Sequence, residues 1–193
     1  MTSTGKKWTG RILAGLLGVI CLLCFQGIQA EEVEKGRIPA EHLQKTCKKL
    51  PWGILVWDNE EAIEKMNSGT GILWVDTRPV ELFSSGTVRD AVCIPYNQTG
   101  KDGNELTQKT LLSALTSKNM SKDNTTIAFF CQGPECHRSY NATLAAVAQW
   151  GFAPEHVIWF RDGYPNLFSA VKADTKLKRK AKKYLCDNAI KQL

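Results

Sequence analysis

The chain has 193 residues, a formal net charge of +6 and 43% hydrophobic residues. This length is enough for one well-buried domain and too little for two ordinary ones. Much of the positive charge lies in residues 172–183, and the remainder after residue 30 has no basic stripe that could neutralise phosphates, which argues against a nucleic-acid binder.

The first 30 residues have the three parts of a secretory signal peptide. A cationic start precedes an apolar run over residues 12–25, which is shorter than the roughly 20 apolar residues that span a bilayer. A cleavage-like site ends at Ala30, but Ile28 within it is larger than the small residue favoured there, so an uncleaved anchor remains the alternative. Cleavage would leave 163 residues with a net charge of +3, and we expect them in the periplasm or outside the cell, with membrane contact only during export.

Five cysteines follow the predicted signal, and an odd number leaves at least one thiol unpaired within the chain. They are Cys47, Cys93, Cys131, Cys136 and Cys186. A disulfide between Cys47 and Cys186 would tie the two ends of the chain together and contribute about 2–4 kcal/mol in the chain-entropy picture. Under that hypothesis Cys93, which lies in an apolar run, is the unpaired thiol and is buried.

Short apolar runs predict five strands. They are continuous rather than alternating, as expected for strands that are buried on both faces, and this favours a parallel sheet. The runs cover residues 53–57, 72–75, 91–94, 126–130 and 156–160.

Helix-like segments separate these runs. Asp58 and Glu61 form a capping-box pattern at the start of a helix over residues 59–67. Two more helices are predicted over residues 106–115 and 138–150. The alternation indicates the α/β class, as a single domain with a central, mostly parallel five-stranded sheet and helices on both faces.

The predicted domain covers residues 53–170 and has a flank on each side. Residues 31–52 are polar and poorly periodic, so we interpret them as an N-terminal extension. Residues 171–193 form a basic C-terminal helix or tail with a thin apolar stripe, for which a solvated helix is favoured over a docking surface.

The loop that follows the fourth predicted strand carries the most chemical information. Cys131 would stand at the carboxyl end of that strand, where open α/β sheets bind ligands. The amides at the start of the next helix, together with Arg138, would favour the reactive thiolate, provided that the sulfur is exposed. The alternative is an inert, buried cysteine. The loop alone does not separate these interpretations.

Further motifs resemble those of the rhodanese-like family. Residues 72–78 form a strand that ends in Asp76-Thr77-Arg78, and a short Glu-Leu-Phe helix follows at residues 81–83. Residues 86–95 resemble the family's Gly-His-Ile stretch, with Thr87 and Val88 in place of the usual pair, and residues 160–165 resemble its Gly-Gly turn, with Asp162 at the first glycine. The ordered match covers about residues 53–170.

The resemblance implies a role for each loop residue. Cys131 is the nucleophile that carries a persulfide, and Arg138 holds an anionic donor or its leaving group. Asp76 and Arg78 are structural. The residues that the resemblance places around the transferred sulfur are Gln132, Gly133, Glu135 and Cys136, through their amides, with Ser139 at the start of the helix.

Several features depart from the family pattern. Arg138 comes seven positions after Cys131, where the family has its basic or small residue at five, so a wider pocket is expected. Pro134 lacks an N–H group and Glu135 adds negative charge, so thiosulfate is expected to be a poor donor.

Cys136 is similar to the second loop cysteine of an exported branch of the family, some of whose members are linked to periplasmic quinoprotein oxidation systems. It could resolve a persulfide or sulfenate on Cys131 and leave a disulfide, or simply fill space. No metal or other cofactor is expected, because Cys131, Cys136 and His137 lack a fourth ligand. We give His137 no role, as a solvated loop residue.

The leading prediction is a sulfurtransferase that passes sulfane sulfur from Cys131 to a thiol, cyanide or a protein acceptor. The alternatives are a thiol-disulfide oxidoreductase that uses Cys131 and Cys136, and a non-catalytic binding module. The expected partners are a small sulfur-containing anion or thiol and a periplasmic protein. Phosphatase or arsenate reductase chemistry is disfavoured, because six residues rather than five separate Cys131 from Arg138.

Overall fold

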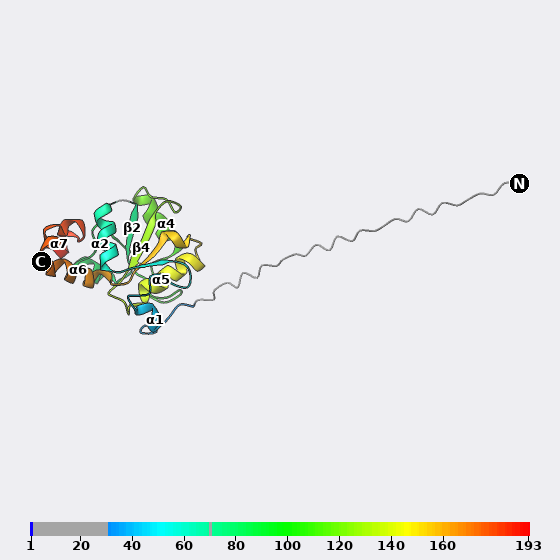
Figure 1. Ribbon diagram of the computed structural model, residues 1–193, viewed down its shortest axis with the longest axis horizontal. Coiled ribbons are helices and arrows are strands. Elements are labelled where there is room, and N and C mark those ends of the chain that lie inside the picture. Colours follow the sequence, from blue (N-terminus) through cyan, green and yellow to red (C-terminus); the bar gives the residue numbers. More distant parts are fainter. Residues whose placement is uncertain (2–30, 70) are drawn as a thin grey trace.

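The structure of the protein is a computed structural model that describes residues 1, 31–69 and 71–193 (Figure 1). Apart from its first residue, the predicted signal peptide lies outside the described residues. Among the residues described, none of the helices has the length and apolar character needed to cross a membrane.

Five strands form one sheet in the order β1-β5-β4-β2-β3, and every neighbouring pair is parallel. This confirms the predicted α/β fold, and the sheet is entirely parallel rather than mostly so. The strands are β1 (Leu55–Trp57), β2 (Ile72–Asp76), β3 (Val92–Cys93), β4 (Thr126–Phe130) and β5 (Val157–Phe160).

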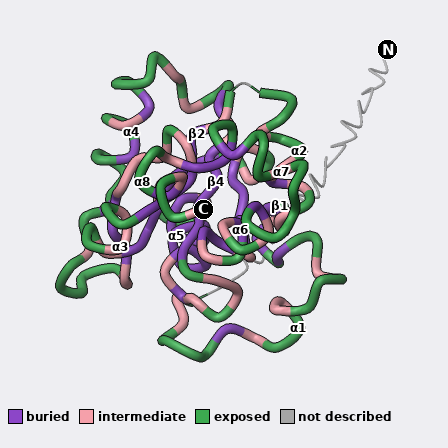
Figure 2. The backbone as a smooth tube through the Cα atoms, turned by 90° about the vertical axis from the view of Figure 1, so that its left-hand side faces the viewer, coloured by how far each residue is buried: buried purple, intermediate pink, exposed green. Residues whose placement is uncertain are grey.

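The central strand β4 explains why the apolar runs are continuous. Ile127 and Phe129 face one side of the sheet, Ala128 and Phe130 face the other, and all four are fully buried. Both sides are therefore covered, so neither face of the strand offers a place for polar residues. Buried residues accordingly gather in the central strands, with exposed segments around them (Figure 2).

Helices cover both faces, as predicted. One face packs against α4 (Gln108–Ser117) and α5 (His137–Ala148), and the other packs against α2 (Asn59–Ser68) and α6 (Gly163–Ala173). Two short helices, α3 (Val80–Ser85) and η1 (Pro154–His156), lie in the connections.

Residues 31–52 pack onto the first of these faces. Ile38, Leu50 and Trp52 are buried in the core there, and α1 (Ala40–Leu43) lies beside them. The Val33 amide donates to Asn141 Oδ1 at 2.9 Å, and Asn141 Nδ2 donates back to the Val33 carbonyl at 2.8 Å. This N-terminal segment is therefore continuous with the domain.

The basic tail is not a solvated helix, which corrects the expectation from its composition. It forms α7 (Thr175–Arg179), η2 (Ala181–Lys183) and α8 (Asp187–Ile190), and its apolar stripe is buried against the second face of the sheet. An antiparallel bridge joins Leu185 to Val88. The lysines stay exposed, while the residues between them complete the core.

Candidate active site

Cys131 directly follows β4, at the carboxyl edge of the sheet, as predicted. The end of β4 is fixed from both sides. The amide and hydroxyl of Thr77 donate to the Phe130 carbonyl at 3.0 and 2.9 Å, and the Tyr164 amide donates to the Cys131 carbonyl at 3.0 Å. The segments that follow β2, β4 and β5 therefore meet at this cysteine.

Gly163 allows the start of α6 to lie against the cysteine loop. Its φ is +69°, and a Cβ atom there would stand 2.4 Å from the Cys131 carbonyl oxygen and 2.9 Å from the Gly133 nitrogen. No other residue type fits so close an approach to backbone atoms. The second position of the family's closing turn is thus glycine for a steric reason, while Asp162 at the first accepts a hydrogen bond from the Asn59 amide at 2.9 Å.

Cys131 and Cys136 form a disulfide, and their Cα atoms are 6.2 Å apart. The prediction that the two sulfurs can meet is confirmed. The expectation of an exposed Cys131 thiol is wrong for this oxidised form, because Cys131 is only 1% exposed and its sulfur is bonded. Cys136, by contrast, is partly exposed.

Cys136 is also the N-cap residue of α5. The Cys131 sulfur, bonded to it, therefore lies at the N-terminus of a 12-residue helix. In the described part of the chain, the amides of His137, Arg138 and Ser139 in the first turn have no acceptor. These groups carry the partial positive charge of the helix end, so the position favours an anionic sulfur.

A pocket of about 710 Å³ opens beside the disulfide. It brings together most of the residues that the resemblance selected. Those that line it are Gln132, Gly133, Glu135, Cys136 and Arg138.

Other walls of the pocket were not predicted. Lys35, Gly36 and Leu43 of the N-terminal segment line it, and so do Leu82 of α3 and Asn166 of α6. No motif marks residues 31–50, so the sequence offered no signal for their place at the site.

Two expected contributions to the site are corrected. Ser139 does not face the pocket, because its hydroxyl is buried and accepts a hydrogen bond from Trp159 Nε1 at 3.2 Å. The Cys136 amide is not free for a bound sulfur, because it donates to the Gly133 carbonyl at 3.0 Å. The amides of Gln132, Gly133 and Glu135 have no protein acceptor in the described residues.

Arg138 and His137 both line the pocket, but only Arg138 carries a charge at pH 7. Arg138 donates from Nη1 to the Tyr96 carbonyl at 2.6 Å; burial lowers its pKa, but a guanidinium stays protonated at neutral pH. His137 is buried rather than solvated, which corrects its expected place, and its ring pairs with Asn97 Oδ1 at 3.0 Å. Burial, with the charges of Arg138 and Lys35, lowers the pKa of His137, so the ring is neutral at pH 7.

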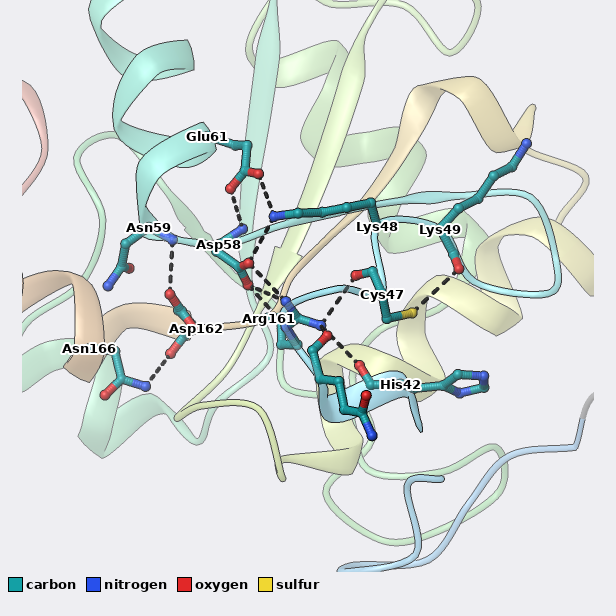
Figure 3. A network of polar contacts seen from close by, with 11 residues as sticks. His42, Cys47, Lys48, Lys49, Asp58, Asn59, Glu61, Arg161, Asp162 and Asn166 are labelled. Carbon is teal, nitrogen blue, oxygen red and sulfur yellow. Dashed lines mark hydrogen bonds and ion pairs between the residues drawn. The ribbon is translucent and has the colours of Figure 1, made fainter. Parts of the chain in front are cut away.

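Arg161 holds residues 42–47 in place (Figure 3). These residues include Leu43 of the pocket lining, and we call them the N-terminal wall. Its Nε and Nη2 atoms bind the Asp58 carboxylate at 2.6–3.0 Å. Its Nη1 donates to the carbonyls of His42 at 3.1 Å and Cys47 at 3.2 Å, and also to that of Gln44. One buried side chain thus joins β5, α2 and the turn after α1.

A second buried ion pair lies at the end of β2. Arg78 Nη2 is 2.6 Å from Asp76 Oδ2 and donates to the Gly86 carbonyl at 2.7 Å, and Thr87 Oγ1 donates to the same carboxylate at 2.7 Å. These contacts join the end of β2 to residues 86–87; the structural role of Asp76 and Arg78 remains what the resemblance implies.

Of the cysteines in residues 31–193, the three outside the disulfide are free thiols. Cys47 packs against the core on one face of the sheet and Cys186 against the core on the other, so the hypothesis of a Cys47–Cys186 disulfide is wrong. Cys93 is only partly buried. Burial and the nearby negative charges of Asp76 and Glu105 raise the pKa of its thiol to about 11.

Cys93 is therefore expected to alkylate slowly in the native protein. A pKa of about 11 instead of 9.0 leaves roughly a hundred-fold less thiolate at pH 8, and only the thiolate reacts. Iodoacetamide labelling with peptide mapping should show this deficit relative to the urea-unfolded chain, with the native rate still rising as the pH approaches 11. A native rate that levels off at the same pH as in urea would contradict the raised pKa.

The geometry defines a class: a parallel α/β domain with a cysteine at the end of a central strand and at the start of a helix. The family model for the rhodanese-like domain matches residues 58–170, more than half of the chain. The protein therefore belongs to the rhodanese-like domain family. No curated protein matched the sequence.

Three similar solved structures are described by sequence identity, by the share of each chain that is covered and by TM-score. The BH2092 protein from Bacillus halodurans is 25% identical, with 64% of this chain and 73% of that chain covered and a TM-score of 0.42. The rhodanese-like domain of Alr3790 from Anabaena is 17% identical, with 59% and 73% covered and a TM-score of 0.40. Saccharomyces cerevisiae Ygr203w, described as a homolog of single-domain rhodanese and the Cdc25 phosphatase catalytic domain, is 16% identical, with 68% and 86% covered and a TM-score of 0.48.

Proposed function

We propose that this protein is an exported sulfurtransferase that carries sulfane sulfur as a persulfide on Cys131 when the loop disulfide is reduced. The observation that carries the proposal is the place of the Cys131 sulfur, at the end of β4 and at the N-terminus of α5. Helix amides favour a thiolate there, and a persulfide anion for the same reason. Arg138, whose guanidinium donates to the Tyr96 carbonyl, adds positive charge to the adjoining pocket.

The transfer needs only one activated sulfur. The Cys131 thiolate attacks the outer sulfur of a donor R–S–S⁻, the donor's S–S bond breaks, and R–S⁻ leaves as a Cys131 persulfide forms. An acceptor thiolate or cyanide then attacks the outer sulfur of that persulfide, and the Cys131 thiolate is restored. The amides of Gln132, Gly133 and Glu135 are free to bind the transferred sulfur.

Cys136 gives the persulfide a second outcome. Its thiolate can attack the Cys131 Sγ of the protonated persulfide, Cys131–S–SH, and expel hydrosulfide, HS⁻, which leaves the Cys131–Cys136 disulfide. The sulfane sulfur is then reduced to sulfide, while the two cysteines are oxidised. Each such event stops sulfur transfer until a thiol reduces the disulfide.

The proposal is tested by sulfur loading of single-cysteine variants. The protein is reduced, desalted, exposed to polysulfide or thiosulfate, and analysed by intact mass and peptide mapping. We expect Cys131→Ser to gain no sulfur at residue 131 and to lose transfer to cyanide, while Cys136→Ser gains one sulfur atom on Cys131 and retains it longer than the wild type. Thiosulfate should load less than polysulfide, because Glu135 lines the pocket. Full transfer activity in Cys131→Ser would rule the mechanism out.

The disulfide itself favours one second candidate, a thiol-disulfide oxidoreductase that uses Cys131 and Cys136. This activity would oxidise a substrate dithiol and needs no sulfur donor. The two functions differ in the Cys136→Ser variant, which keeps persulfide formation under the first and loses all activity under the second.

A further inference from the structure

The two sulfurs of the loop disulfide are not equally accessible. Cys136 is partly exposed and lines the pocket. Cys131 is 1% exposed and is not among the residues that line the pocket; its carbonyl is held by the Tyr164 amide, and Gly163 packs directly against its backbone. A thiolate that opens a disulfide must reach one of its two sulfurs. A thiolate in the pocket therefore meets Cys136 rather than Cys131.

Attack on Cys136 also has a stabilised leaving group. When Cys136 is attacked, the departing sulfur is that of Cys131, and both sulfurs lie at the unpaired amides of the first turn of α5, because Cys136 is its N-cap residue. Those amides stabilise the negative charge that develops on the departing sulfur. The direction of attack is therefore set by access.

The walls of the pocket indicate the kind of reductant. Lys35 and Arg138 are cationic, His137 is neutral, and Glu135 is the acidic residue among the lining residues described, so a thiolate is not repelled. A space of about 710 Å³ is far larger than a sulfide ion. Leu43, Pro79 and Leu82 give it an apolar wall, which suits a cysteine carried on a protein loop better than a free anion.

We propose that a protein dithiol reduces the loop disulfide through this pocket, by attack on Cys136 Sγ with departure of Cys131 as the thiolate. The partner's first thiolate forms a mixed disulfide with Cys136. Its second thiol, after losing a proton, attacks the first partner sulfur, which breaks the mixed disulfide and releases the Cys136 thiolate. The partner is oxidised to a disulfide and both cysteines of the loop are reduced, so two electrons are transferred. This inference rests on the proposed function, because the Cys131 thiolate released is the group that accepts sulfur.

The point of attack is tested with glutathione as a monothiol probe. The oxidised wild-type protein is mixed briefly with glutathione and quenched in acid, the free thiols are then alkylated with excess N-ethylmaleimide at mildly acidic pH, and the product is mapped by peptide mass spectrometry. At the earliest times we expect glutathione on Cys136 and maleimide on Cys131. Glutathione on Cys131, or equally on both, would overturn the proposal. No sulfur donor is present, so this result is independent of persulfide formation; failure of sulfur loading with glutathione on Cys136 would overturn only the proposed function.

The class of partner is tested by the rate of reduction. A reduced thioredoxin-type protein should reduce the disulfide at least about tenfold faster than glutathione at matched thiolate concentration, because the bound partner positions its thiolate. Leu82→Asp should slow the protein dithiol several-fold, and a matched change on α4, Leu112→Asp, should not. Leu82 is only partly buried and Leu112 is exposed, and the melting temperature of each variant checks its fold. Equal rates for the two reductants, or equal slowing by both substitutions, would contradict a protein partner at this pocket.

Discussion

Replacing Arg161 with methionine is expected to lower the free energy of unfolding by about 3–5 kcal/mol, because the substitution leaves the Asp58 carboxylate without its buried partner. Arg161 is 1% exposed, and its guanidinium binds both oxygens of Asp58. It also satisfies the carbonyls of His42, Gln44 and Cys47, which no methionine can do. The loss is a large part of the 5–15 kcal/mol that stabilises an ordinary domain.

Urea denaturation monitored by tryptophan fluorescence measures this loss. Arg89→Met is the matched control, since Arg89 pairs with Asp187 at the surface, where an ion pair contributes little. The double substitution Arg161→Met with Asp58→Asn removes the unpaired charge and keeps a capping side chain for α2. It should not restore stability, because the three carbonyls remain without a donor. Recovery in the double variant would mean that the ion pair alone matters and that Arg161 does not anchor the N-terminal wall.

Replacing Gly163 with alanine is expected to destabilise the protein by about 2–5 kcal/mol and to displace the cysteine loop. Two effects add. A φ of +69° strains any residue with a Cβ, and the added atom would stand 2.4 Å from a backbone oxygen that a strand and a helix hold in place. Because that oxygen belongs to Cys131, the strain falls on the proposed nucleophile.

Gly103→Ala separates the two effects. Gly103 has nearly the same φ, +71°, with no atom within 4 Å of the added Cβ, so it reports the backbone strain alone. We expect Gly163→Ala to be the more destabilised of the two by urea denaturation, and to load sulfur more slowly than Gly103→Ala. Equal stabilities would show that the loop yields to the extra atom.

The strands and the site cysteine could be predicted because their signals are local. The run from Ile127 to Phe130 is apolar at every position, as expected of a strand that is buried on both faces, and Cys131 follows it directly. Cys136 comes five positions after Cys131, so their approach in a loop was also predictable. The family motifs singled out Arg138 and the loop residues after Cys131, and these residues line one pocket.

The errors concern partners that are distant in the sequence. The apolar stripe around Tyr184 and Leu185 has the same sequence pattern whether it faces solvent or the core. Val88, which pairs with Leu185, lies far away in the chain. The N-terminal wall depends on Arg161, whose carbonyl partners carry no side-chain signal. Ser139 seemed part of the site from its nearness in sequence, but the helix turns its hydroxyl toward Trp159.

The central claim is that the sulfur of Cys131, once freed from Cys136, is the atom that accepts sulfane sulfur. Peptide mapping of the wild-type protein after polysulfide treatment, with and without prior reduction, tests it most directly. We predict one added sulfur atom on the Cys131 peptide after reduction and none there in the oxidised protein. Equal loading of the two forms, or added sulfur found only on Cys47, Cys93 or Cys186, would contradict the claim.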